Sequence, residues 1–157
     1  MKSGLKQRVV GVIVVRSGWA VQSIGFHRYL PVGRPEIAVE YLNRWGIDEI
    51  ILLDIDATLQ GRKPDFDAVR RYAQLGQVPL TVGGGIAELA DIERLIRAGA
   101  DKVSLNWSAL RRPDLIGTGA SRYGAQCIVV SLDARLRADG RYEVFARGGR
   151  EATGQGP

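Results

Sequence analysis

The stretch from Pro79 to Ile86 (PLTVGGGI) decides how this chain folds. A short apolar run breaks into three glycines just before a helical pattern, as in a strand followed by a turn into a helix. Without side chains, this turn would let an anion lie against backbone N–H groups beside the positive end of the helix. A tight turn that binds nothing would need the same glycines, so both interpretations stay open.

The segments on either side of this stretch have the same strand-then-helix form. Strands are predicted over residues 8–15, 49–56, 79–82, 102–105 and 126–133, and helices over 35–46, 65–73, 90–99 and about 112–123. This alternation favours right-handed crossovers and a parallel sheet. After the fifth strand, Asp139-Gly140 predicts a β-hairpin. Residues 16–34 are expected to form a long polar connection, either a solvated loop or a lid.

The first and fifth predicted strands resemble each other, since VVGVIVVR aligns with IVVSLDAR and Val14 stands opposite Asp133. The chain therefore looks like one half of a twofold-repeated barrel with the start of its second half. We expect a single domain over residues 1–157, with four βα units over 1–125 and a fifth strand, a hairpin and a truncated end over 126–157.

Polar side chains stand at the ends of three predicted strands. Asp54 and Asp56 end the second strand, and Asn106 ends the fourth. Because the carboxyl ends of barrel strands form one face, these side chains are candidates for a common site. Each aspartate could instead serve as a turn residue or a helix cap.

The composition narrows the class of protein. The chain has 157 residues, 45% of them hydrophobic, and a single cysteine, Cys127, which favours a cytoplasmic protein without disulfides. No apolar stretch is long enough for a membrane span. A net charge of +5 suits an anionic ligand, but the basic residues are scattered and do not suggest a nucleic-acid surface. We expect no cofactor and no metal site.

From Arg8 to Gly154 the chain resembles the cyclase subunit of imidazole glycerol phosphate synthase, an enzyme of histidine biosynthesis. The matching stretches are DEIILLDI (48–55), GRK (61–63), PLTVGGGI (79–86), AGADKVSLN (98–106), QCIVVSLD (126–133), GGR (148–150) and ATG (152–154). The resemblance implies a TIM barrel, (βα)₈, of the α/β class. It implies a lyase that takes ammonia from a glutaminase partner in a heterodimer. This lyase would convert a phosphorylated aminoimidazole ribonucleotide precursor into two products, imidazole glycerol phosphate and a carboxamide ribonucleotide.

The resemblance also implies roles for single residues. Asp133 matches a catalytic aspartate that acts as a general acid, Asp54 an active-site carboxylate, and Asp101 a position facing the glutaminase. Gly85 and Asn106 match residues that hold a substrate phosphate, with Gly83 and Gly84 as candidates from the same glycine turn, and the ammonia gate would contain Arg8, Glu49 and Lys102. Opposite charges at strand starts could equally be structural ion pairs.

Three positions depart from the family pattern. Val14 stands where the family has its second catalytic aspartate, Gln22 where it has a lysine, and Trp107 where a small hydroxyl residue would help to hold phosphate. A complete barrel needs about 250 residues, so we expect a fragment or a truncated product with exposed apolar strand edges. Two alternatives are a paralogue that relays ammonia to a separate amidating enzyme, for example one acting on a surface-polysaccharide sugar, and a non-catalytic half barrel that binds phosphate or a partner.

Overall fold

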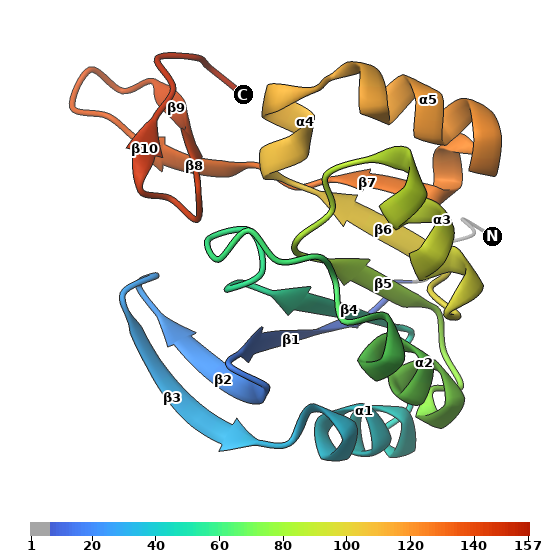
Figure 1. The fold of residues 1–157 in the computed structure, drawn as a ribbon. Coiled ribbons are helices and arrows are strands. Elements are labelled where there is room, and N and C mark those ends of the chain that lie inside the picture. Colours follow the sequence, from blue (N-terminus) through green and yellow to red (C-terminus); the bar gives the residue numbers. More distant parts are fainter. Residues whose placement is uncertain (1–6) are drawn as a thin grey trace, which may run out of the picture.

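The computed structural model describes residues 7–157, which form two sheets and a layer of helices (Figure 1). The large sheet has seven strands in the order β3-β2-β1-β4-β5-β6-β7, and the small sheet has three in the order β10-β9-β8. The strands are β1 (Val10–Arg16), β2 (Trp19–Ile24), β3 (Arg28–Gly33), β4 (Glu49–Asp54), β5 (Leu80–Gly83), β6 (Lys102–Leu105), β7 (Ile128–Val130), β8 (Asp133–Leu136), β9 (Tyr142–Ala146) and β10 (Glu151–Ala152). The helices are α1 (Pro35–Arg44), α2 (Phe66–Leu75), α3 (Leu89–Arg97), α4 (Trp107–Arg111), α5 (Asp114–Tyr123) and the short 3₁₀ helix η1 (Ala125–Cys127).

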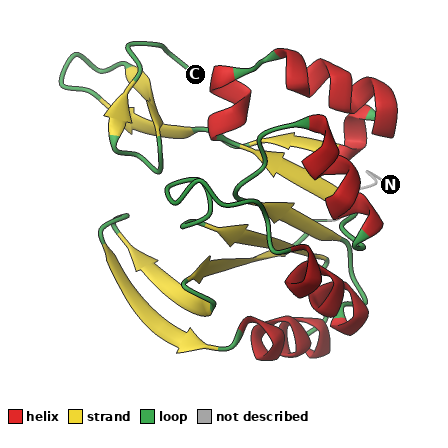
Figure 2. Cartoon of the chain, in the orientation of Figure 1, coloured by secondary structure: helices red, strands yellow, loops and turns green. Residues whose placement is uncertain are grey.

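Strands β1, β4, β5, β6 and β7 run parallel, as the alternating pattern predicted. Figure 2 shows the longer helices gathered on one side of this sheet. The core lies between the two layers, where Ile50 and Val103 from the sheet meet Ile92 and Leu95 from α3, each 1% exposed or less. Burial on this face explains the apolar runs in the strands. The parallel α/β fold with half-barrel character is thereby confirmed.

The other face of the parallel strands is open. Val10 and Val12 on β1 are 41% and 56% exposed. The register aligns Val12 with Ile51, Ile51 with Thr81 and Thr81 with Lys102, so these residues share this face, which is open at β1 and covered at Thr81, 1% exposed. The exposed apolar side chains lie on a face of β1 and not on a strand edge, since β1 is paired with β2 and β4.

The predicted irregular connection over residues 16–34 is wrong, because β2 and β3 form an antiparallel hairpin on β1. Ser17 and Gly18 connect β1 to β2 with φ angles of +50° and +78°. Two central residues with positive φ match the twist of the flanking strands, so a two-residue turn closes the pair. The connection therefore extends the sheet.

One predicted boundary near the C-terminal end is also wrong. The helix expected over about 112–123 is present as α5, and Pro113 separates it from α4, a short helix that was not predicted. The strand expected over residues 126–133 is only three residues long, β7, and Asp133 instead begins β8, where it pairs with Phe145 of β9. The β8–β9 hairpin around Asp139-Gly140 is confirmed. Because β8 pairs with β9, Asp133 lies in the small sheet and not in the parallel sheet.

The two glycines inside α5 are expected to respond to alanine in opposite ways. A Cβ at Gly117 would meet nothing within 4 Å, whereas one at Gly119 would lie 2.9 Å from Cδ1 of Ile128. Gly117→Ala should stabilise the fold by about 0.5–1 kcal/mol through helix propensity. Gly119→Ala should destabilise it, because α5 packs closely on β7 at this point. Urea unfolding of both variants measures the difference, and a stabilised Gly119→Ala would contradict this packing.

Candidate active site

A cavity of about 450 Å³ lies at the carboxyl ends of the parallel strands. Its lining includes side chains at the ends of β1, β4 and β6 and in the segments and hairpins beside them: Val14, Arg16, Phe26, Tyr29, Asp54, Asp56, Ser104, Asn106, Trp107, Asp133, Arg147 and Arg150. Gly83 and Gly84 contribute backbone to the same cavity. The structure therefore brings together every predicted catalytic and phosphate-binding residue except Gly85.

Close packing explains the three glycines. Gly84 has a φ of +108°, and a Cβ there would collide with the carbonyl oxygen of Asp54. Gly85 has a φ of +73°, and a Cβ there would lie 2.5 Å from the carbonyl oxygen of Arg62. The Gly85 N–H donates to Thr58 Oγ1 at 3.2 Å. The glycines are thus needed for the turn itself, and an anion in this cavity would meet Gly83 and Gly84 rather than Gly85.

A lysine fastens the loop after β4 to the start of α3. Lys63 Nζ donates to Asp91 Oδ2 at 2.8 Å and to Glu88 Oε1 at 2.7 Å. Hydrogen bonds to Asp91 and Glu88 raise the pKa of Lys63 above its ordinary value. Asp91 is 2% exposed and also accepts from the Ala87 and Glu88 backbone N–H groups. These contacts fix the segment that follows the glycine turn.

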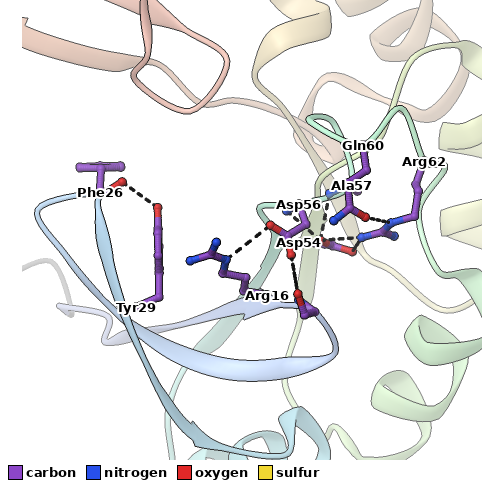
Figure 3. A network of polar contacts seen from close by, with 9 residues as sticks. Arg16, Phe26, Tyr29, Asp54, Asp56, Ala57, Gln60 and Arg62 are labelled. Carbon is purple, nitrogen blue, oxygen red and sulfur yellow. Dashed lines mark hydrogen bonds and ion pairs between the residues drawn. The ribbon is translucent and has the colours of Figure 1, made fainter.

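The two aspartates after β4 hold their own loop in place (Figure 3). Asp54 Oδ1 accepts from the backbone N–H groups of Asp56 and Ala57, both at 3.1 Å, and Asp54 Oδ2 lies 3.2 Å from Arg62 Nη2. Asp56 is 8% exposed and accepts from the N–H and hydroxyl of Ser17 at 2.9 and 3.0 Å. Both therefore act as turn residues and also line the cavity, and their part in a common site stays a prediction.

Asp133 is partly buried beside Asn106 and Arg135. Burial raises the pKa of its carboxyl above the ordinary value, although Asn106, Arg135 and the Gly149 N–H favour the charged form. A carboxyl that keeps its proton to higher pH can donate it closer to neutrality. Asn106 is itself oriented by its Nδ2 donating to the Ser131 carbonyl oxygen at 2.9 Å.

The departures from the family pattern fall at different places. Val14 lines the cavity and has no proton to exchange. Trp107 also lines it, as the first residue of α4. Gln22 is exposed on β2 opposite Leu30, outside the cavity lining. The cavity therefore has an apolar side chain at the end of β1 and an indole ring at the start of α4.

A polar cluster lies at the amino ends of the same strands, on the open face. Lys102 Nζ donates to both carboxylate oxygens of Glu49 at 2.8 Å, and Thr81 Oγ1 donates to Glu49 Oε1 at 2.9 Å. Burial alone would raise the pKa of Glu49. Hydrogen bonds from Lys102 and Thr81, with the charges of Lys102 and Arg8, outweigh burial and hold the pKa below its ordinary value of 4.5. Nearby, Asp101 Oδ2 accepts from the Leu80 N–H at 2.7 Å.

Glu49 should make stability depend on pH. Its pKa is lowered in the folded state, so its contribution is present above pH 4.5 and is lost as pH falls through the folded-state pKa. Above this range, Glu49→Gln should lower the unfolding free energy by about 1–3 kcal/mol, the contribution of hydrogen bonds to a charged group. The exposed pair Asp67 and Arg70 provides the control, because Asp67→Asn should cost less than about 1 kcal/mol. Urea unfolding of both variants from about pH 3 to about pH 7, a range that spans the ordinary carboxyl pKa values, tests this dependence. A Glu49→Gln difference that does not shrink at low pH would contradict it.

The lining residues that sequence reasoning did not assign to a site include Arg16, Tyr29, Arg147 and Arg150. The signal for the first two was the Ser17-Gly18 turn, which predicts a hairpin rather than a loop. Within residues 7–157, no three His, Cys, Asp or Glu side chains are grouped to hold a metal ion. Across the same residues, no helix has the length and apolar character needed to span a membrane.

Comparisons with known proteins add family information. The family model for the histidine biosynthesis protein matches residues 8–156. The imidazole glycerol phosphate synthase subunit HisF of Bacillus cereus is 48% identical over 151 residues, which is 96% of this chain and 60% of that protein. The subunit HisF of a Synechococcus species is 48% identical over 148 residues, 94% of this chain and 56% of that protein. The chain thus spans less than two thirds of the length of these curated relatives.

Proposed function

This chain belongs to the histidine biosynthesis protein family, and we propose that it acts as a cyclase subunit of the imidazole glycerol phosphate synthase type. In this proposal, a lyase reaction consumes ammonia from a glutaminase partner. It converts a phosphorylated aminoimidazole ribonucleotide precursor into imidazole glycerol phosphate and a carboxamide ribonucleotide. The proposed setting is the cytoplasm, where the free Cys127 would stay reduced.

One observation carries this proposal: the open face of the parallel strands has a polar cluster at each end. Glu49, Thr81 and Lys102 lie at the amino ends, and Asp133 and Asn106 line the cavity at the carboxyl ends. A small neutral molecule that enters beside Glu49 and Lys102 could follow this face to the cavity. There, Asp133 would protonate the leaving group, and Gly83, Gly84 and Asn106 would hold a substrate phosphate.

Asp101 supports the proposed glutaminase interface by its position. It is exposed, and it precedes Lys102 at the amino end of β6. A glutaminase docked there would release ammonia beside the polar cluster.

Sedimentation of the chain mixed with a glutaminase subunit tests the partner. Asp101→Asn keeps an oxygen to accept from the Leu80 N–H but removes the charge, and should weaken association about tenfold, which is 1.4 kcal/mol. Asp139→Asn makes the same change in the exposed turn between β8 and β9 and should have no effect. If the two proteins do not associate, this chain does not receive ammonia from such a partner.

A second candidate function is favoured by the side chain at the end of β1. Val14 lines the cavity where cyclisation would need a second proton-transfer group, while the polar cluster of Glu49, Thr81 and Lys102 is intact. A paralogue that relays ammonia to a separate amidating enzyme would need only the cluster. Association with a glutaminase without turnover of the ribonucleotide precursor would favour this candidate. The remaining alternative, a non-catalytic half barrel, would bind phosphate or a partner without turnover and without passing ammonia to another enzyme.

A further inference from the structure

Three arginines reach the cavity from two hairpins that adjoin the strand ends. Arg16 lies at the base of the β1–β2–β3 hairpin, and Arg147 and Arg150 lie in the turn between β9 and β10. Figure 1 shows both hairpins on the side where the parallel strands end. We propose that Arg16, Arg147 and Arg150 form an anion-binding subsite for a phosphate or carboxylate group of the ligand. This subsite is separate from the backbone of Gly83 and Gly84.

Arg16 is held in place by contacts on both sides (Figure 3). Its guanidinium carbon lies 4.5 Å from the centre of the Tyr29 ring, and its Nε lies 3.7 Å from Asp56 Oδ1. Tyr29 is in turn oriented by its hydroxyl, which donates to the Phe26 carbonyl oxygen at 2.9 Å. The Arg16 side chain is nevertheless 45% exposed, so its remaining N–H groups can meet a ligand. A guanidinium stacked on a ring is preorganised for an anion.

The turn between β9 and β10 presents the other two arginines. Arg147, Gly148 and Gly149 have φ angles of +51°, +68° and +75°, and the Arg150 N–H closes the turn on the Ala146 carbonyl oxygen at 3.0 Å. Arg135 braces this turn, because its Nη2 donates to the Gly149 carbonyl oxygen at 2.7 Å. The left-handed backbone thus places Gly148 and two guanidinium groups along one wall of the cavity.

Two carboxylates of the cavity are engaged by neighbouring groups. Asp54 accepts two backbone N–H groups and pairs with Arg62, and Asp56 accepts from Ser17 and compensates Arg16 in part. Arg147 is partly compensated, since its Nη1 lies 3.0 Å from Glu151 Oε1. The hairpin side of the cavity is therefore left with an excess of positive charge. Paired guanidinium groups bind phosphate and carboxylate with two parallel hydrogen bonds, which makes either anion a suitable ligand.

The inference rests on the proposed function only in placing the ligand in this cavity, and its test needs no turnover. Inorganic phosphate and malonate are titrated separately into the full chain at constant ionic strength, and backbone amide shifts are followed by NMR. We expect saturable shifts at Gly148, Gly149 and Arg150. Arg16→Gln combined with Arg150→Gln should raise the Kd at least about tenfold, the effect of losing about 1.4 kcal/mol. Lysine at both positions should restore part of the affinity, because it keeps the charge.

The matched control is Arg28→Gln combined with Arg141→Gln. It removes the same charge from β3 and from the turn between β8 and β9, at exposed positions outside the cavity lining. The control should change the Kd less than about twofold, as expected for screened charges at a distance.

Equal losses of anion affinity in both double variants, or shifts confined to Gly83, Gly84 and Asn106, would overturn the subsite. A response to phosphate alone identifies a phosphate site, and a response to malonate alone a carboxylate site. Anion binding without precursor turnover would keep the subsite and count against the proposed function, whereas turnover without anion binding would do the reverse.

Discussion

Val14→Asp combined with Gln22→Lys is expected to raise precursor turnover at least about a hundredfold, the lower end of what a positioned acid or base contributes. Cyclisation needs proton transfer on two sides of the substrate, and the cavity has Asp133 but only a valine at the end of β1. Asp54 and Asp56 are already committed to the loop after β4. The first substitution supplies the missing carboxylate at the cavity, and the second restores the family's lysine at position 22, outside the cavity lining.

The turnover assay uses the ribonucleotide precursor with an ammonium salt, which makes the glutaminase unnecessary. A fragment of the Bacillus cereus relative supplies the part of its length that this chain does not match. The control is Val12→Asp combined with Gln22→Lys. It keeps the same lysine and places the aspartate two residues earlier on the same strand and face, outside the cavity lining. The control should show no gain. If the unmodified chain turns over at a rate that Val14→Asp does not improve, the argument from Val14 is wrong.

Gly84→Ala is expected to destabilise the fold by at least about 3 kcal/mol, because it combines backbone strain with a steric clash. Gly84 has a φ of +108°, and its added Cβ would overlap the Asp54 carbonyl oxygen. Neither group can move easily, since β4 and β5 are paired there through Leu53 and Gly83. Urea unfolding measures the loss.

Gly61→Ala is the matched control for this substitution. Gly61 also has a positive φ, +64°, but an added Cβ would meet nothing within 4 Å. Its cost should therefore be limited to the left-handed conformation, about 1–2 kcal/mol. Equal losses in both variants would show that packing against Asp54 does not matter.

The sequence was sufficient to predict the parallel strands, because each strand is indicated by residues within and directly beside it. In PLTVGGGI, the apolar run, the glycines and the following helix agree with one another, and the structure has β5, a turn and α3 there. It was not sufficient for β2 and β3, because their polar and aromatic residues show no clear strand pattern. Pro31 fits in β3 because this strand lies at the edge of the sheet, where a missing N–H can be tolerated.

The site was predictable only where strand ends determine it. Asp54 and Asn106 were expected to share one face because parallel strands end on the same side, and both line the cavity. Asp133 lines it too, although it belongs to β8 rather than to the parallel sheet. Arg147 could not be placed, since its position depends on three successive positive φ angles in a turn.

Calorimetric titration of the unmodified chain with the phosphorylated aminoimidazole ribonucleotide precursor tests whether the cavity binds this substrate. We expect saturable binding of one ligand per chain. Asn106→Ala should weaken it, because Asn106 lines the cavity at the end of β6. Asn43→Ala, on α1 outside the lining, should leave the affinity unchanged, although it costs stability by losing its bond to the Gln77 N–H. Absence of binding, or equal affinity with and without Asn106, would contradict the assignment of this cavity as the substrate site.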